Sequence, residues 1–184
     1  DVAETSTVVD TLTTDIQPPG PPISLTAGDS NPSPWKNTPQ FELNWTNPPD
    51  DNNIARGYYK LNSIPSSNND YTDIVGDPPH LVSATIQGGQ DLYLWLEDGR
   101  GNRNFQNYAM VKLRYDGARP VNTVASSPDT SVYETFTVNW SGATDAGGSG
   151  LSGRYDIRVR EDQSAWSYWL TDSLCTSAEY TGKQ

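Results

Sequence analysis

The chain has 184 residues but only one cysteine, one histidine and one methionine. A single cysteine cannot form an intrachain disulfide, and the Cys/His spacing of a structural zinc site is missing. Cysteine usage alone does not identify the compartment. The sequence also lacks any apolar run near the ~18 residues that a transmembrane helix needs. We therefore expect no membrane insertion.

Positive charge is scarce as well, with 12 Lys and Arg against 23 Asp and Glu, a formal net charge of −11. Binding to nucleic acid or to an anionic membrane surface needs a cationic face, so neither partner is expected. Hydrophobic residues make up 34% of the chain, below the roughly 45–50% of ordinary globular chains. Six Trp, ten Tyr, 15 Gly and 14 Pro favour short strands with frequent turns.

Two pairs of segments recur at an almost constant spacing, which indicates an internal repeat. Phe41–Trp45 is matched by Phe136–Trp140, 95 residues later, and both alternate apolar and polar residues. Gly57–Leu61 is matched by Gly153–Ile157, 96 residues later. Alternation places the Phe, the aliphatic residue and the Trp of each segment on one face of a strand.

The alternation and turn signals predict strands throughout, and no segment shows a helical period. Gly88 and Gly89 predict a hairpin between two of these strands. The frequent turns are typical of immunoglobulin-like sandwiches. The predicted strands are Ile23–Ala27, Phe41–Trp45, Ala55–Leu61, Leu81–Gln87, Asp91–Glu97, Asn107–Tyr115, Val121–Ala125, Thr135–Trp140, Arg154–Arg160, Trp166–Leu170 and Glu179–Thr181.

The repeat predicts an all-β chain of tandem immunoglobulin-like sandwiches, the second one incomplete. Residues 18–118 form the complete sandwich, and residues 119–184 lack counterparts of its last two strands. Residues 1–17 resemble the last strand of a preceding module, because Thr7–Leu12 leads to Asp15 and then Pro18, as Val111–Tyr115 leads to Asp116 and then Pro120. The chain begins at Asp1 and its only methionine is Met110, so we expect a processed or excised piece.

Several short motifs, in this order, resemble tandem fibronectin type III-like or bacterial immunoglobulin-like modules of large secreted and surface proteins. The motifs are Trp45 and Trp140, Leu92–Trp95, Asp98-x-x-Gly101-Asn102, Asp145 with Gly148–Leu151 before Tyr155, and Trp166-x-x-Trp169. The resemblance implies an extracellular or bacterial cell-surface location and neighbouring modules as partners. It also implies a spacer, an adhesive stalk, or an accessory module of a carbohydrate-active enzyme.

The sequence offers few parts of an active site, so we expect no catalytic residue and no enzyme. His80 follows Pro78 and Pro79 in a predicted loop, and the neighbours of Cys175 indicate ordinary packing. There is no GxSxG motif and no phosphate-binding loop. Glycoside hydrolysis needs a carboxylate pair, and nothing selects one among 23 acidic residues.

No cofactor is expected, and calcium is the one candidate ion, because acidic turns supply the oxygen ligands it prefers. The candidate ligands are Asp50, Asp51, Asp98 and Asn102, with Asn68–Asp70 as a further acidic turn. None of these turns matches the spacing of an EF-hand. The alternative is that Asp and Asn simply cap their own turns.

The aromatic residues divide by strand alternation. Trp45, Trp95 and Trp140 are expected in the core. Trp166 and Tyr168 fall on one face of a strand and Trp169 on the other, so at least one should be exposed. Trp166 and Trp169 are the candidate glycan-binding residues, and packing against the sandwich is the alternative.

These observations suggest three functions, and we expect the first of them. The chain is a non-catalytic structural or adhesive module, with the Asp116–Pro120 linker joining two sandwiches. The alternative is a carbohydrate-binding accessory module. A second alternative is self-association, in which residues 1–17 of one copy complete the exposed strand edge of residues 119–184 in another. The competing interpretation is that the chain is a fragment with both ends disordered, because a single strand cannot replace the two strands that residues 119–184 lack.

Overall fold

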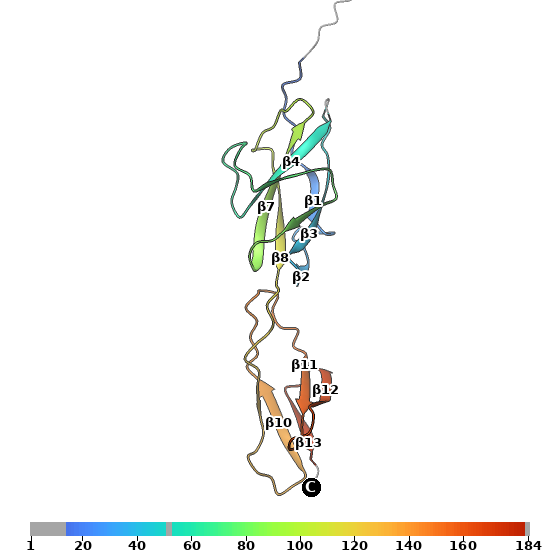
Figure 1. Cartoon of the computed structure of the whole chain (residues 1–184), viewed down its shortest axis with the longest axis vertical. Coiled ribbons are helices and arrows are strands. Elements are labelled where there is room, and N and C mark those ends of the chain that lie inside the picture. The colour runs from blue at the N-terminus through green and yellow to red at the C-terminus, as the bar shows by residue number, and fades with distance from the viewer. Residues whose placement is uncertain (1–13, 51–52, 183–184) are drawn as a thin grey trace, which may run out of the picture. The chain divides into compact units, whose positions relative to one another are not determined.

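The computed structural model describes residues 14–50 and 53–182, and in these residues the chain is all-β (Figure 1). The predicted fold class is therefore confirmed. The described residues contain no helix with the length and apolarity that a membrane span requires. The strands are β1 (Ile23–Ala27), β2 (Trp35–Lys36), β3 (Gln40–Thr46), β4 (Ile54–Leu61), β5 (Asp73–Val75), β6 (His80–Ser83), β7 (Gly88–Asp98), β8 (Ala109–Tyr115), β9 (Val124–Ser126), β10 (Thr135–Ser141), β11 (Tyr155–Val159), β12 (Ser167–Ser173) and β13 (Ser177–Thr181).

The chain divides into two compact units. Unit 1 takes in the described residues up to Pro34 together with Gln40–Ser83 and Gln90–Leu113. Unit 2 takes in Trp35–Pro39, Ala84–Gly89 and the described residues from Arg114 onward. The predicted module boundaries after residues 17 and 118 stay predictions.

Unit 1 is built on two sheets that form a β-sandwich. One has the order β1-β3-β6 and is antiparallel, with β3 and β6 paired from Gln40↔Ser83 to Leu43↔His80. The other has the order β2-β8-β7-β4-β5, to which unit 1 contributes β4, β5 and most of β7 and β8. Strand β4 pairs along its length with β7, antiparallel, as far as Leu61↔Leu92.

The core of unit 1 follows the alternation read from the sequence. Phe41 and Leu43 point inward from β3 with no more than 1% of their surface exposed. Leu92, Leu94 and Leu96 do the same from β7. Each fully buried aliphatic or aromatic side chain stabilises the fold by about 1.5–3 kcal/mol. Strand β7 is thus the central element of the sandwich.

Unit 2 repeats part of this arrangement, with one sheet of order β13-β10-β9 and a second made of β11 and β12. The repeat equivalents of Phe41 and Leu43 are Phe136 and Val138 on β10, and both are only half-buried. Trp140 at the end of β10 is 3% exposed. Within residues 114–182, no strand takes the places that β7 and β8 hold in unit 1.

Two details of the sequence prediction were wrong or incomplete. The Gly88–Gly89 hairpin does not form, because both glycines belong to β7 and the preceding β6 lies in the other sheet. The chain therefore crosses between sheets at residues 84–87 instead of folding back. The short strands β2 and β5 were not predicted, since two or three residues are too few to show a period.

Candidate functional site

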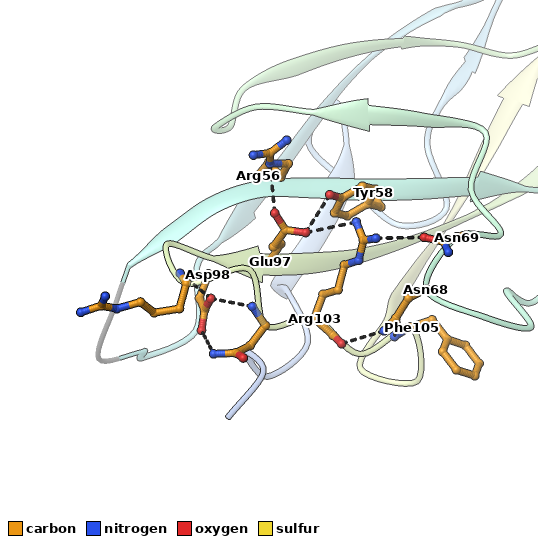
Figure 2. Close-up of polar contacts among 10 residues, drawn as sticks. Arg56, Tyr58, Asn68, Asn69, Glu97, Asp98, Arg103 and Phe105 are labelled. Atoms are coloured by element: carbon orange, nitrogen blue, oxygen red, sulfur yellow. Dashed lines mark hydrogen bonds and ion pairs between the residues drawn. The ribbon is translucent and has the colours of Figure 1, made fainter. Parts of the chain in front are cut away.

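A buried carboxylate, Glu97, lies near the end of β7 and has three polar partners, two of which donate hydrogen bonds to it (Figure 2). Its Oε2 accepts hydrogen bonds from the Tyr58 hydroxyl at 2.7 Å and from Arg103 Nη1 at 3.1 Å. Its Oε1 faces Arg56 Nε at 3.2 Å. The antiparallel pairing of β4 with β7 sets Arg56 opposite Glu97 and so places two of these partners, Arg56 and Tyr58, beside the carboxylate.

Arg103 extends this network to the loop between β4 and β5. Its Nη2 donates to Asn69 Oδ1 at 2.9 Å, and its backbone oxygen accepts from Asn68 Nδ2 at 3.0 Å. Asn68 Oδ1 in turn accepts from the Phe105 backbone amide at 2.7 Å. These hydrogen bonds connect the loop between β4 and β5 to the loop that follows β7, beside Glu97.

The aromatic ring of Tyr58 packs between Trp95 and the Arg103 side chain of this network. It stacks on Trp95 at 5.9 Å between centroids and lies under the Arg103 guanidinium at 4.5 Å. Burial and the hydrogen bond to Glu97 raise the pKa of Tyr58 above its ordinary value. A carboxylate with three partners beside a tyrosine that stays protonated is suited to cross-linking strands and loops. This arrangement is poorly suited to proton transfer, because the carboxylate, the hydroxyl and both guanidiniums already hold one another in hydrogen bonds or ion pairs.

Asp98, the next residue, organises the turn that follows β7. Its Oδ1 accepts from the backbone amides of Arg100 and Asn102, both at 2.8 Å, and its Oδ2 accepts from Asn102 Nδ2 at 2.8 Å. Gly101 has a φ of 88°, a conformation that glycine adopts without steric cost. Burial acts to raise the pKa of Asp98, but these hydrogen bonds outweigh it and lower the pKa.

Three carboxylates from distant parts of unit 1 converge at this turn. Ligand oxygens of Asp15, Asp50 and Asp98 all lie within 4.8 Å of one another. Asn102 is adjacent, since its Nδ2 also donates to the Asp15 backbone oxygen at 3.1 Å. Hard cations prefer such oxygens, although calcium takes six to eight of them. Within the described residues, these three carboxylates lie close enough together to share a metal ion.

The structure thus brings together three of the four residues predicted for calcium, namely Asp50, Asp98 and Asn102. Asp51 lies outside the described residues. Asp15 was not predicted as a ligand, and no local signal could have found it, because 83 positions separate it from Asp98.

The acidic turn Asn68–Asp70 instead serves the fold. Asp70 accepts from Lys60 Nζ at 2.5 Å and from the amide and hydroxyl of Ser66 at 2.8 and 2.7 Å. The hydrogen bond from Lys60, followed by those from Ser66, lowers the pKa of Asp70 to about 2. The negative charge of Asp70 is therefore balanced by the Lys60 side chain of the same unit.

The aromatic residues near β12 separate onto two faces, as alternation predicts. Trp166 and Tyr168 are 59% and 56% exposed, under the guanidiniums of Arg160 and Arg158 at 4.9 and 4.6 Å. Trp169 turns the other way and packs edge-on against two further rings, Trp140 at 6.2 Å and Tyr180 at 5.1 Å. The two candidate glycan-binding tryptophans therefore do not share a surface. Trp45, Trp95 and Trp140 are at most 7% exposed, which confirms their place in the core.

The two residues considered for nucleophilic chemistry are placed differently from expectation. His80 begins β6 and pairs with Leu43, so it belongs to a strand and not to a loop. Cys175 is exposed, and the packing expected from its neighbours is wrong. Its backbone oxygen accepts a hydrogen bond from Trp140 Nε1 at 2.8 Å, so the fold uses the main chain at this position and not the thiol.

No protein-family model matches this chain, and no curated protein matches it significantly.

Proposed function

We propose that this chain is a non-catalytic structural segment, a spacer or adhesive stalk of a larger extracellular or bacterial cell-surface protein. The observation that carries the proposal is the Glu97 network of unit 1. A buried carboxylate with a 10% exposed side chain is held by Arg103, Arg56 and Tyr58 at once. Such a network fixes one packing of the strands and loops. Neighbouring modules of a longer chain are the proposed partners.

The acidic surface supports the same role, because an excess of like charge keeps long extended proteins soluble and apart. The pairing of β4 with β7 supports it too. The two strands run antiparallel over Ile54–Leu61, and pulling the sandwich apart must break this ladder together with the Glu97 contacts.

Single-molecule force spectroscopy on the full chain, held at its two ends, tests the proposal. Unit 1 should unfold in one discrete event that releases on the order of 300 Å of chain, since an extended residue spans about 3.3–3.6 Å. The Glu97→Gln variant should unfold at lower force. The matched variant Glu42→Gln, at an exposed position of β3, should behave like the parent chain. Gradual extension without a discrete event would overturn the spacer role.

A carbohydrate-binding accessory module is the second candidate, supported by the exposed pair Trp166 and Tyr168 on one face of unit 2. An exposed ring can stack on a sugar. Here each ring already has an arginine over it, so an acidic polysaccharide, which attracts the guanidiniums, is the favoured class of ligand.

A pull-down with neutral and acidic polysaccharides separates the two candidates. Under the binding-module hypothesis, Trp166→Ala should abolish retention and Arg160→Ala should weaken it for the acidic polymer only. The spacer hypothesis predicts no retention of the parent chain by any of these polymers. A hydrolase would release sugar from them during the same incubation, and we expect no release.

A further inference from the structure

Two Asn-x-Ser/Thr triplets lie at equivalent positions of the repeat. Asn44–Thr46 ends β3, and Asn139–Ser141 ends β10, 95 residues later. Asn31–Ser33 has the same pattern, but the proline at its middle position excludes it. In secreted proteins such a triplet is the acceptor for N-linked oligosaccharides. Because the pattern is short, its place in the fold decides whether it can carry a glycan.

The triplet of unit 1 faces outward at its first and third positions. Strand alternation turns Trp45 into the core, with 7% of its surface exposed, and leaves Thr46 exposed on the opposite face. Asn44 lies half-buried on that outer face, opposite Thr26 of β1. Its Nδ2 donates to the exposed Glu42 carboxylate at 3.2 Å, so the amide serves the surface and not the core. A sugar joined to this nitrogen would extend away from the sandwich.

The triplet of unit 2 has the same arrangement. Trp140 is 3% exposed, whereas Asn139 and Ser141 on either side of it are exposed. The residues opposite Asn139 are Ser126 of β9 and Ser177 of β13, and both are exposed. Their side chains are small, so they leave room for a sugar ring above Asn139.

We propose that Asn44 and Asn139 carry N-linked oligosaccharides when the chain is secreted, an inference that rests on the extracellular location proposed above. An oligosaccharyltransferase would take the sugar from a lipid pyrophosphate donor. The asparagine Nδ2 forms a bond to C1 of the first sugar, and the C1–O bond to the pyrophosphate breaks. The lipid pyrophosphate leaves with the electron pair, and the amide proton passes to a base of the transferase.

The position of both triplets in the sheets sets the time of transfer. Strands β3 and β10 are the middle strands of the sheets β1-β3-β6 and β13-β10-β9. The backbone beside each asparagine is therefore paired with a neighbouring strand once the sheet has formed. We expect transfer to the extended chain before the sheets form, and folding then leaves each glycan on an outer face.

An exposed aliphatic side chain lies near each site, on the same face of the sheet. Leu81 is 64% exposed and lies opposite Glu42, two residues before Asn44. Val124 is 62% exposed and lies opposite Ser141, two residues after Asn139. Directly opposed residues of an antiparallel pair share a face, so the first sugars would cover these apolar surfaces.

Mass spectrometry of the full chain, secreted from a eukaryotic cell, tests the proposal. The intact mass should exceed that of the unmodified chain by two oligosaccharides. Treatment with peptide N-glycosidase should remove both and leave aspartate at each site. Thr46→Ala should abolish the glycan on Asn44, because the hydroxyl of the triplet is lost, whereas the matched Thr46→Ser should retain it. Both variants should keep the glycan on Asn139.

Pro128→Asn is the positive control, because it creates a further triplet that ends at Thr130 in the exposed segment before β10. Modification of this control site without modification of Asn44 or Asn139 would overturn the assignment of the unmodified asparagine. A parent chain that keeps its unmodified mass would overturn both assignments, and so would a glycan on Asn44 that survives Thr46→Ala. Force spectroscopy tests the spacer role on the unmodified chain, so the two proposals can fail separately.

Discussion

The substitution Glu97→Gln removes the charge from the buried network of unit 1 and keeps its shape. Tyr58 can still donate to the amide oxygen, but a hydrogen bond to a charged group, about 1.5–3 kcal/mol, becomes a neutral one of about 1 kcal/mol. Arg103, with a side chain 24% exposed, loses its carboxylate, at a further cost of about 1–2 kcal/mol. Arg56 is half exposed, so its part stays near the ~0–1 kcal/mol of a surface pair.

These contributions give an expected loss of about 2–4 kcal/mol for unit 1. One kcal/mol shifts the melting temperature of a domain of 60–100 residues by about 4–8 °C, so the transition should fall by at least ~8 °C. Differential scanning calorimetry of the full chain measures this shift. Glu42→Gln is the matched control, because Glu42 is exposed and accepts one hydrogen bond, from Asn44 at 3.2 Å. A Glu97→Gln transition within ~2 °C of the parent chain would refute the reasoning.

Three further results are expected. The pKa of Asp70 is lowered to about 2 from an ordinary 3.8, so its contribution to stability is present above pH ~4 and is lost as the pH falls through 2. Asp70→Asn should flatten the acid limb of a urea-unfolding series over that range, and an unchanged limb would contradict the assignment. Phe41→Ala should cost unit 1 about 3–5 kcal/mol, while the repeat-equivalent Phe136→Ala, at a half-buried position, should cost less than about 2 kcal/mol. Hydrogen exchange resolved by unit checks this pair, and equal costs would mean that Phe136 is as well packed as Phe41. Trp169→Ala should lower the melting temperature of unit 2, because each aromatic pair adds about 0.5–1.5 kcal/mol, whereas Trp166→Ala should change stability by less than about 0.5 kcal/mol. Calorimetry distinguishes these variants, and a larger effect at Trp166 would reverse the assignment of faces.

The two units differ in how completely their equivalent core residues are buried. Phe41 and Phe136 occupy the same place in the repeat, yet one is 1% exposed and the other half-buried. The difference comes from the partners and not from the strands themselves. Leu92, Leu94 and Leu96 of β7 cover the core of unit 1, and among the strands of residues 114–182 none covers Phe136 in the same way.

The local pattern of apolar and polar residues predicted the fold class and much of the core. The alternation in Phe41–Trp45 places its three apolar residues on one face, and the structure buries all three. The same rule places Trp166 and Trp169 on opposite faces, as the structure does. Such predictions succeed because side-chain direction along a strand has a period of two and depends only on neighbouring residues.

Pairing between distant segments was decided only by the tertiary structure. Glu97 gains its partners from β4 and from a loop beyond its own strand, and Asp15 reaches Asp98 across 83 positions. The Gly88–Gly89 signal suggested a hairpin, but the strands on either side joined different sheets. Burial of apolar faces against one another selects these long-range pairings, and the sequence near any one residue does not record which distant strand will cover it.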